Sequence, residues 1–172
     1  MKTFQQFITE GRDAPLYHGT SVADAVEIIN TDEMEARTPQ VHMGLFPQKP
    51  KHVVKGISLS RNHRVASQFG PVVFEFDQRK LVHRHKIIPF QFADSEIAGY
   101  PKAIAARSTE GSVTGAYSAE SEEFVIGPIR DVDKYITAIH VHYLVFKNMR
   151  SSFSDPIRTH PKLNVWGRDA DD

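Results

Sequence analysis

Two segments of this chain carry residues whose side chains could bind a ligand or take part in catalysis. His18 lies in the segment LYHGTS, and a neutral imidazole can donate through one ring nitrogen while it accepts through the other. Gly19 has no side chain, so a ligand can approach its backbone closely. Glu122 and Glu123 directly precede the apolar residues 124–126. A carboxylate beside a reacting centre can stabilise positive charge that develops in a transition state.

A third segment, GISLSRNHRVASQFG, lies between these two in the sequence. Its pattern predicts a strand over residues 53–59 and a helix over residues 62–69 that ends at Gly70-Pro71. The polar residues Ser58, Ser60 and Arg61 then come at the end of a strand. We therefore expect one strand to end in His-Gly-Thr, a second to end in these polar residues, and a third to begin after the glutamates.

The remaining elements are predicted from hydrophobic period and from turn residues. Further strands are expected at 72–76, 86–92 and 137–146, a helix at 22–30, a turn at 78–81, and a long loop from Thr31 to Lys55. Residues 151–172 are polar and end in acidic residues, so they are expected to form a poorly packed tail, with Trp166 docking it on the domain. Many short strands with few helices predict an α+β domain.

Composition is that of a single globular domain. The chain has 172 residues, of which 40% are hydrophobic, and its formal net charge is zero. It has no cysteine, which excludes disulfides and thiolate chemistry, and no apolar run of the roughly 20 residues that a membrane span needs. Residues 61–86 are rich in Arg, Lys and His; they form either a solvated face or a patch that attracts the phosphates of a dinucleotide or nucleic acid.

The order of the three motifs resembles that of the ADP-ribosyltransferases, and most of all the branch that contains the poly(ADP-ribose) polymerases. The resemblance covers residues 16–145. It implies an α+β fold of two small antiparallel sheets packed face to face, with flanking helices, and NAD bound as a substrate in the cleft between the sheets. The resemblance to this family implies an enzyme that transfers ADP-ribose and releases nicotinamide.

The resemblance also implies roles for individual residues. His18 would donate to the ribose on the adenosine side, Gly19 would bind the nicotinamide amide through its backbone, and Phe69 would stack on the nicotinamide ring. The predicted NAD-binding set is His18, Gly19, Thr20, Ser58, Ser60, Arg61 and Phe69. Glu123 is the first choice for the catalytic carboxylate. Glu122 is the alternative, because adjacent strand residues face opposite sides and only one can face the cleft.

This chain departs from the polymerase-like pattern at two places. Ser58 stands where that branch has a tyrosine, and Ala66 stands where it has a serine. Chain elongation is therefore not expected, and single transfer or NAD hydrolysis is favoured. If Glu122 is catalytic, Glu120 completes the Glu-x-Glu pattern of arginine-modifying members; if Glu123 is catalytic, Ser121 takes that place.

The first ten residues, MKTFQQFITE, resemble the capsid-targeting sequence of internal head proteins from T-even-type tailed phages. In that family a prohead protease cuts after a glutamate such as Glu10. The expected organisation is a propeptide over 1–10, a catalytic domain over 11–150 and a tail over 151–172. The expected location is the interior of the virion and then the host cytoplasm. There the enzyme would modify a host acceptor, which we expect to be a protein rather than a nucleic acid. We also expect the enzyme to be a monomer and to bind no membrane.

Two other functions remain open from the sequence. One is an enzyme related to RNA 2-phosphotransferases, which would need a basic phosphate pocket. The other is a catalytically dead internal head protein that binds DNA or a host factor. A metal site is not expected, because His140 and His142 share one strand face without a third ligand nearby.

Overall fold

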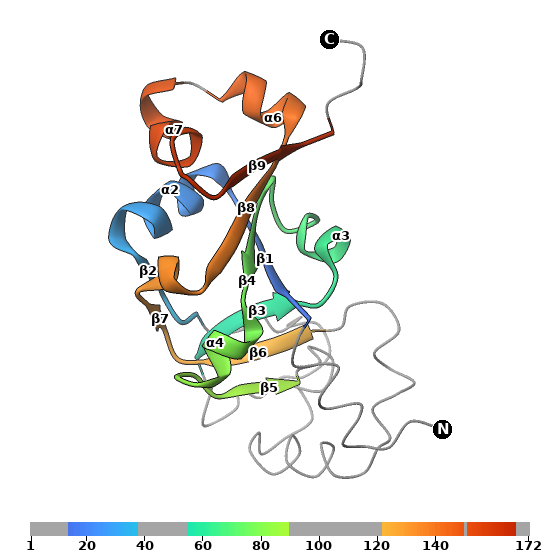
Figure 1. Ribbon diagram of the computed structural model, residues 1–172, viewed down its shortest axis with the longest axis vertical. Coiled ribbons are helices and arrows are strands. Elements are labelled where there is room, and N and C mark those ends of the chain that lie inside the picture. The colour runs from blue at the N-terminus through green and yellow to red at the C-terminus, as the bar shows by residue number, and fades with distance from the viewer. Residues whose placement is uncertain (1–13, 38–54, 90–121, 150, 168–172) are drawn as a thin grey trace, which may run out of the picture.

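The computed structural model describes residues 14–37, 55–89, 122–149 and 151–167. Their centre is a seven-stranded sheet with the strand order β5-β6-β3-β1-β4-β8-β9 (Figure 1). The strands are β1 (Leu16–Thr20), β3 (Gly56–Ser60), β4 (Val72–Phe76), β5 (Ile87–Pro89), β6 (Glu122–Ile126), β8 (Ile136–His142) and β9 (Leu163–Trp166). All neighbouring strands are antiparallel except β8 and β9, which are parallel. The prediction of an α+β fold is confirmed.

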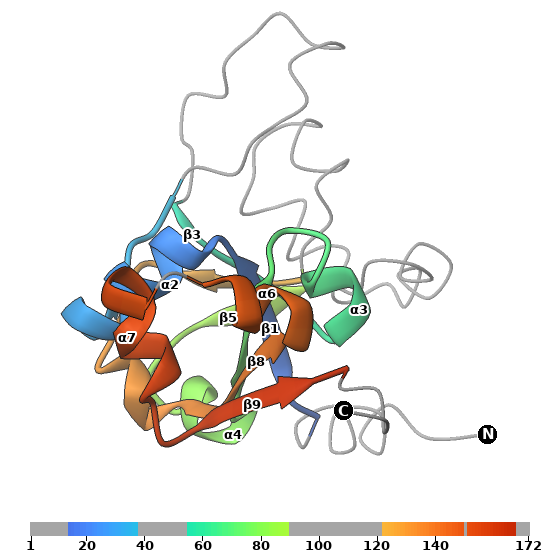
Figure 2. The same cartoon turned by 90° about the horizontal axis from the view of Figure 1, so that it is seen from above.

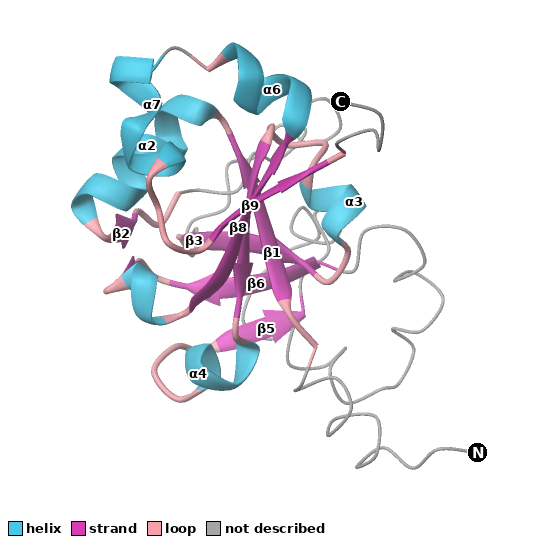
Figure 3. Ribbon diagram, turned by 45° about the horizontal axis from the view of Figure 1, so that its top comes forward, coloured by secondary structure: helices cyan, strands magenta, loops and turns pink. Residues whose placement is uncertain are grey.

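The sheet has a weak point between β1 and β3. Strand β1 pairs with β4 along its whole length, from Leu16 opposite Phe76 to Thr20 opposite Val72. It pairs with β3 only where Tyr17 lies opposite Ser60. On one side of this junction β5, β6 and β3 run in a direction very different from that of β1, β4 and β8 on the other (Figures 1 and 3). The sheet therefore consists of two parts joined at a single residue pair.

The hydrophobic core lies on one face of the sheet. Alternate residues of the strands, among them Leu16, Phe74 and Ile139, are fully buried there. Two helices contribute to this core, α2 (Val22–Thr31) through Val26 and Ile28 and α7 (Ser151–Arg158) through Ile157. Seen from above, α2 and α7 lie on one side of the strands and the short helix α3 (His63–Ala66) lies on the other (Figure 2).

Local sequence explains where the helices begin. The Ser21 side chain accepts a hydrogen bond from the backbone N–H of Asp24 at 3.0 Å and so caps α2. Asn62 caps α3 in the same way through the N–H of Arg64. Asp77 caps α4 (Gln78–Val82) through the N–H of Lys80, so a segment that the sequence predicted as a turn is a short helix.

The C-terminal segment differs from its prediction. The expected poorly packed tail forms α7 and the edge strand β9, because Ile157 is fully buried and β9 pairs with β8 over four residues. Strand β8 ends at His142, and α6 (Tyr143–Asn148) follows where the sequence predicted more strand, because His142 caps that helix. Trp166 does dock on the domain, against the ring of His142.

The resemblance implied two small antiparallel sheets packed face to face, whereas the described residues form one seven-stranded sheet and one two-stranded sheet whose strands were not predicted. The two-stranded sheet pairs β2 (Glu33–Met34), inside the segment expected to be a loop, with β7 (Ile129–Arg130). The short helix η3 (Val132–Lys134) follows β7. In the part of the chain that the structure describes, no helix is long and apolar enough to cross a membrane.

Candidate functional site at the junction of β1, β3 and β6

The three motifs found in the sequence lie on three neighbouring strands. Strand β3 pairs with β1 on one side and with β6 on the other. Ser60 lies opposite both Tyr17 of β1 and Glu122 of β6, and Leu59 lies opposite Glu123. Segments that are about 40 and 60 residues apart in the sequence thus meet at one end of β3, where the pairing between β1 and β3 stops.

His18 lies at the point where the two parts of the sheet separate. Its Nδ1 lies 2.9 Å from the carbonyl oxygen of Ser58. A carbonyl can only accept, so Nδ1 carries the proton and donates. Burial lowers the pKa of His18, with the nearby Arg37 acting in the same direction, so the neutral imidazole is favoured. Nε2 is then an acceptor. The sequence had led us to expect that His18 donates to a ribose hydroxyl; in this tautomer it would accept from one instead.

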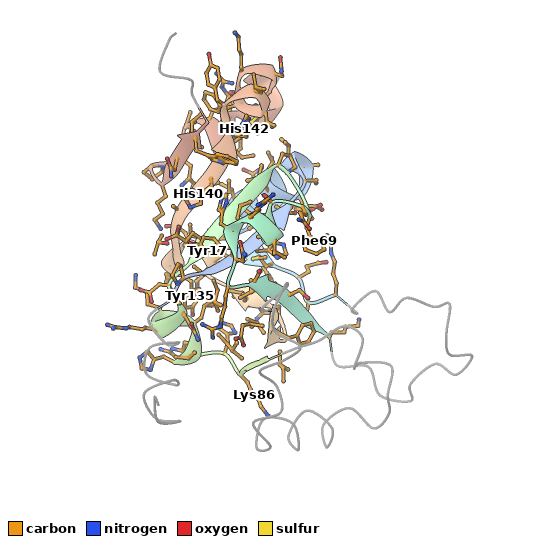
Figure 4. All side chains as sticks on the ribbon, turned by 90° about the vertical axis from the view of Figure 1, so that its right-hand side faces the viewer. Tyr17, Phe69, Lys86, Tyr135, His140 and His142 are labelled. Carbon is orange, nitrogen blue, oxygen red and sulfur yellow. The ribbon has the colours of Figure 1, made fainter. Side chains whose placement is uncertain are left out.

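Two glycines bring the segment after α3 against β1. A Cβ atom on Gly19 would overlap the carbonyl oxygen of Ala66, and one on Gly70 would overlap that of Thr20. Both approaches require glycine, because any side chain would force the backbones apart. Phe69 lies between these two contacts in the sequence, and 65% of it is exposed (Figure 4). The structure therefore places an available aromatic ring beside the His-Gly-Thr motif.

Glu123 has different surroundings from those expected of a substrate-binding carboxylate. Only 6% of it is exposed, and its Oε1 accepts from Nε of Arg61 at 2.7 Å. Nη1 of Arg61 also donates to Oε1 of Gln78 at 3.2 Å. Burial raises the pKa of the Glu123 carboxyl, and the charge of Arg61 and its hydrogen bond oppose that rise. Glu123 is thus a buried carboxylate held by the protein's own cation.

The register of β3 and β6 separates the two glutamates. Residues directly opposite one another in an antiparallel pair share a face, and successive residues alternate. Ser58, Ser60, Phe124 and Glu122 therefore belong to one face, which we call the Ser60 face, and Tyr17 joins it across the junction. Leu59, Glu123 and Val125 belong to the opposite face, which we call the Glu123 face and which joins the hydrophobic core. The side chain of Glu122 lies outside the described part of the structure.

The predicted site residues can now be placed. His18, Gly19, Thr20, Ser58, Ser60 and Phe69 gather around the junction, whereas the guanidinium of Arg61 forms an ion pair with Glu123. Ser60 is itself buried, and its Oγ accepts from the backbone N–H of Asn62 at 3.0 Å. The proposed cleavage point after Glu10 and the upstream Glu120 lie outside the described residues.

Sequence reasoning missed Gln78 and Asp24. Gln78 is buried together with Leu81, three residues further along α4, but five residues are too few for that spacing to show as a helical period in the sequence. Asp24 forms an ion pair with Arg37 at 3.2 Å, and both charges act on the pKa of His18. No sequence signal predicted that pair, because Arg37 lies in a segment that was expected to be a loop.

The histidine pair on β8 forms a polar network of its own. Nε2 of His140 lies 2.8 Å from Oε2 of Glu75, and Nδ1 of His140 lies 3.0 Å from Nδ2 of Asn164. Both ring nitrogens of His140 are therefore in use. Within the described segments, no group of three His, Cys, Asp or Glu side chains is placed to hold a metal ion.

Comparison of the chain with protein-family models, with curated proteins and with solved structures found no match.

Proposed function

We propose that this protein is an NAD-dependent mono-ADP-ribosyltransferase whose site lies at the junction of β1, β3 and β6. The observation that carries the proposal is that three motifs chosen from the sequence for one reaction lie on adjacent strands. Motifs that matched by chance would have no reason to meet. The two parts of the sheet at this junction would correspond to the two sheets that enclose NAD in the resembling family.

Each group at the junction has a task in this proposal. Phe69 stacks on the nicotinamide ring, for which an exposed aromatic side chain is suited. The Gly19 backbone binds the carboxamide. Nε2 of His18 accepts from a ribose hydroxyl on the adenosine side, and the hydrogen bond from Nδ1 to Ser58 keeps the imidazole in the tautomer that this requires.

The reaction breaks the bond between the nicotinamide nitrogen and C1 of ribose. The bonding electron pair leaves with nicotinamide, so positive charge develops on the sugar. A carboxylate bound to the ribose 2-hydroxyl stabilises that charge, most strongly in the transition state. A nucleophilic atom of the acceptor then forms the new bond to C1 and loses its proton. Water in place of the acceptor would give hydrolysis.

The ion pair of Glu123 with Arg61 favours Glu122 as this carboxylate, in place of Glu123, the first choice from the sequence. By the alternation of strand residues, His18 shares the core-side face with Glu123, so the register alone does not decide between the two glutamates. Glu122 belongs to the face that carries Ser58 and Ser60. Glu123 belongs to the face that joins the core, and a substrate hydroxyl would have to displace Arg61 from its Oε1. With Glu122 as the catalytic residue, Glu120 provides the Glu-x-Glu pattern associated with arginine-modifying transferases.

The first ten residues support a place for this activity in a phage life cycle. We propose that residues 1–10 direct the protein into the capsid of a tailed phage, that cleavage follows Glu10, and that the mature enzyme enters the host with the genome. The support is the sequence match at Ile8-Thr9-Glu10. Mass spectrometry of purified particles tests it: a packaged protein that begins at Gly11 is expected, and a packaged protein that retains Met1 would contradict it.

The experiment that tests the enzymatic proposal is nicotinamide release. Purified protein of residues 11–172 is incubated with NAD, and nicotinamide is quantified by liquid chromatography, with and without a lysate of the host as a source of acceptor. Release above the protein-free rate, with label from NAD transferred to a macromolecule, is expected. No release from protein that is folded by circular dichroism, in either condition, would contradict the proposal.

A further inference from the structure

A cluster of basic side chains projects from α4 and the turn that follows it. Lys80, His83, Arg84 and Lys86 are all exposed, and we call this group the α4 basic surface. Lys86 and His142 lie towards opposite ends of the described part of the molecule (Figure 4). The sequence left open whether these residues form a solvated face or bind phosphates.

The backbone that carries this surface is fixed on the domain. Leu81 is fully buried, and its carbonyl accepts from the N–H groups of Arg84 at 3.1 Å and His85 at 2.8 Å. The ring of His85 meets that of Tyr135 edge to face at 5.5 Å, and the carbonyl of Lys86 accepts from Ile126 of β6 at 3.0 Å. The cations are therefore presented by a rigid turn, which lowers the entropy that a ligand must overcome.

The charge of this surface is largely uncompensated. Lys80 has an ion pair with Asp77 at 3.8 Å, but it is an exposed pair of the kind that contributes little. Among the described residues, no carboxylate pairs with Arg84 or Lys86. The acidic residues of the neighbouring η3 region are already paired, Asp131 with Lys134 at 2.9 Å and Asp133 with Lys162 at 2.7 Å. A chain with zero net charge thus concentrates positive charge here.

The helix that carries this surface is linked to the Arg61–Glu123 ion pair. Gln78, the first residue of α4, accepts from Arg61, and Arg61 holds Glu123. The strand β5 that follows the turn pairs with β6, and its last residue, Pro89, lies opposite Glu123. The carbonyl of Lys86, just before β5, accepts from the N–H of Ile126 at the end of β6, so the α4 basic surface adjoins that end of the strand.

We propose that the α4 basic surface binds the phosphate backbone of double-stranded nucleic acid. Protein interfaces are built around an apolar centre with aromatic residues, and the described part of this surface offers only Val82. Contacts from Lys and Arg to phosphates need no such centre. Recognition of single strands relies mainly on exposed Phe, Tyr and Trp rings for stacking, and the described residues of α4 and its turn present none of these three.

The test measures binding in the absence of NAD. A fluorescein-labelled 20-base-pair DNA duplex is titrated with protein, and anisotropy is recorded at 50 and 200 mM salt. Three phosphate contacts predict a slope of about −2.7 in log affinity against log salt, so affinity should fall by about 40-fold between these conditions. The triple variant Lys80→Gln, Arg84→Gln and Lys86→Gln should bind at least about tenfold more weakly at 50 mM salt and lose most of that slope.

A matched control separates this surface from charge in general. The variant Lys55→Gln, Arg130→Gln and Lys147→Gln removes three exposed cations elsewhere, so its net charge is the same as that of the first variant. It should bind the duplex as the unaltered protein does. An equal loss of duplex affinity in both variants would overturn the proposal, as would a failure of the unaltered protein to bind the duplex at 50 mM salt. Competition by polyglutamate that is as effective as competition by unlabelled duplex would also overturn it.

The same variants distinguish this inference from the proposed function. The α4 triple variant should release nicotinamide from NAD as fast as the unaltered protein, because none of its three residues belongs to the proposed NAD site. Normal nicotinamide release together with failed duplex binding would overturn only the inference. Duplex binding without nicotinamide release would support the inference and contradict the transferase.

Discussion

Glu122 and Glu123 are adjacent in the chain, but the sheet gives them opposite surroundings. Glu123 belongs to the face that joins the core, where Arg61 neutralises it and Gln78 holds Arg61 in place. Glu122 is paired with Ser60 and belongs to the opposite face, the Ser60 face. The comparison teaches that adjacent carboxylates at the start of a strand belong to opposite faces, so an ion pair that holds one of them does not extend to its neighbour.

The largest expected effect comes from Glu122→Gln, which keeps the shape of the side chain and removes its charge. Loss of one charge-stabilising group should lower the rate of nicotinamide release by about 10²–10³-fold. Glu123→Gln is the matched control and should keep most of the activity, because Glu123 does not contact substrate in this account. Steady-state kinetics of both variants measure the difference, and the reverse result would exchange the roles of the two residues.

The next effect is on stability and concerns Arg61→Met. This change leaves Glu123 buried without its cation, which should lower the free energy of unfolding at pH 7.5 by about 1–3 kcal/mol. Burial already raises the pKa of Glu123, and loss of Arg61 raises it further. The folded state of this variant therefore favours the protonated carboxyl of Glu123. The loss of stability is absent below the pKa of about 4.3 that Glu123 has in the unfolded chain, and it grows as pH rises through the higher pKa of Glu123 in the folded state.

Denaturant unfolding at pH 4 and pH 7.5 measures this dependence. The double variant Arg61→Met with Glu123→Gln should recover most of the lost stability at pH 7.5, because no buried charge is left alone. A destabilisation of Arg61→Met that is the same at both pH values would show that the ion pair is not its cause.

Phe69→Ala should have a smaller effect, confined to NAD binding. A stacking ring contributes about 0.5–1.5 kcal/mol, so the KM for NAD should rise by about three- to tenfold with little change in kcat. Stability should not change, because 65% of Phe69 is exposed. Leu144→Ala, which also removes a largely exposed apolar side chain, is the control and should leave KM unchanged. An unchanged KM for Phe69→Ala would remove this ring from the site.

The smallest effect is a change of NAD binding with pH through His18. Burial lowers the pKa of His18, so Nε2 remains an acceptor down to pH values below the usual 6.5. The KM for NAD should therefore stay constant from pH 8 to 6.5 and rise only at lower pH, as protonation converts Nε2 into a donor. His18→Gln should lack this rise; the same acid limb in both proteins would assign it to another group.

Much of the sheet could be predicted from the sequence because its strands are short apolar runs with clear ends. The runs around Leu16, Val72 and Phe124 are confirmed as strands, and the helical period at Val22 and Val26 is confirmed as α2. The predicted tail was wrong because its polar composition hid one inward residue, Ile157. Helix α4 was missed because five residues are too few to show a period.

The site could be predicted only as a set of segments. The sequence brought His18, Ser58 and the glutamates together through their resemblance to one family, and the structure places them on adjacent strands. The choice between Glu122 and Glu123 depends on which face of β6 joins the core, and that follows from the pairing of Leu59 with Glu123 across 64 residues of sequence. No local pattern contains that information, and none indicated that Arg61 would turn towards Glu123.

The most direct test of this account is a crystal structure with an NAD analogue whose bond between nicotinamide and ribose cannot be cleaved. The account predicts the nicotinamide ring against Phe69 and the Gly19 backbone, with the ribose 2-hydroxyl bound by Glu122 and the pair of Arg61 with Glu123 intact. An analogue bound away from the junction of β1, β3 and β6, or a ribose held by Glu123 after displacement of Arg61, would contradict it.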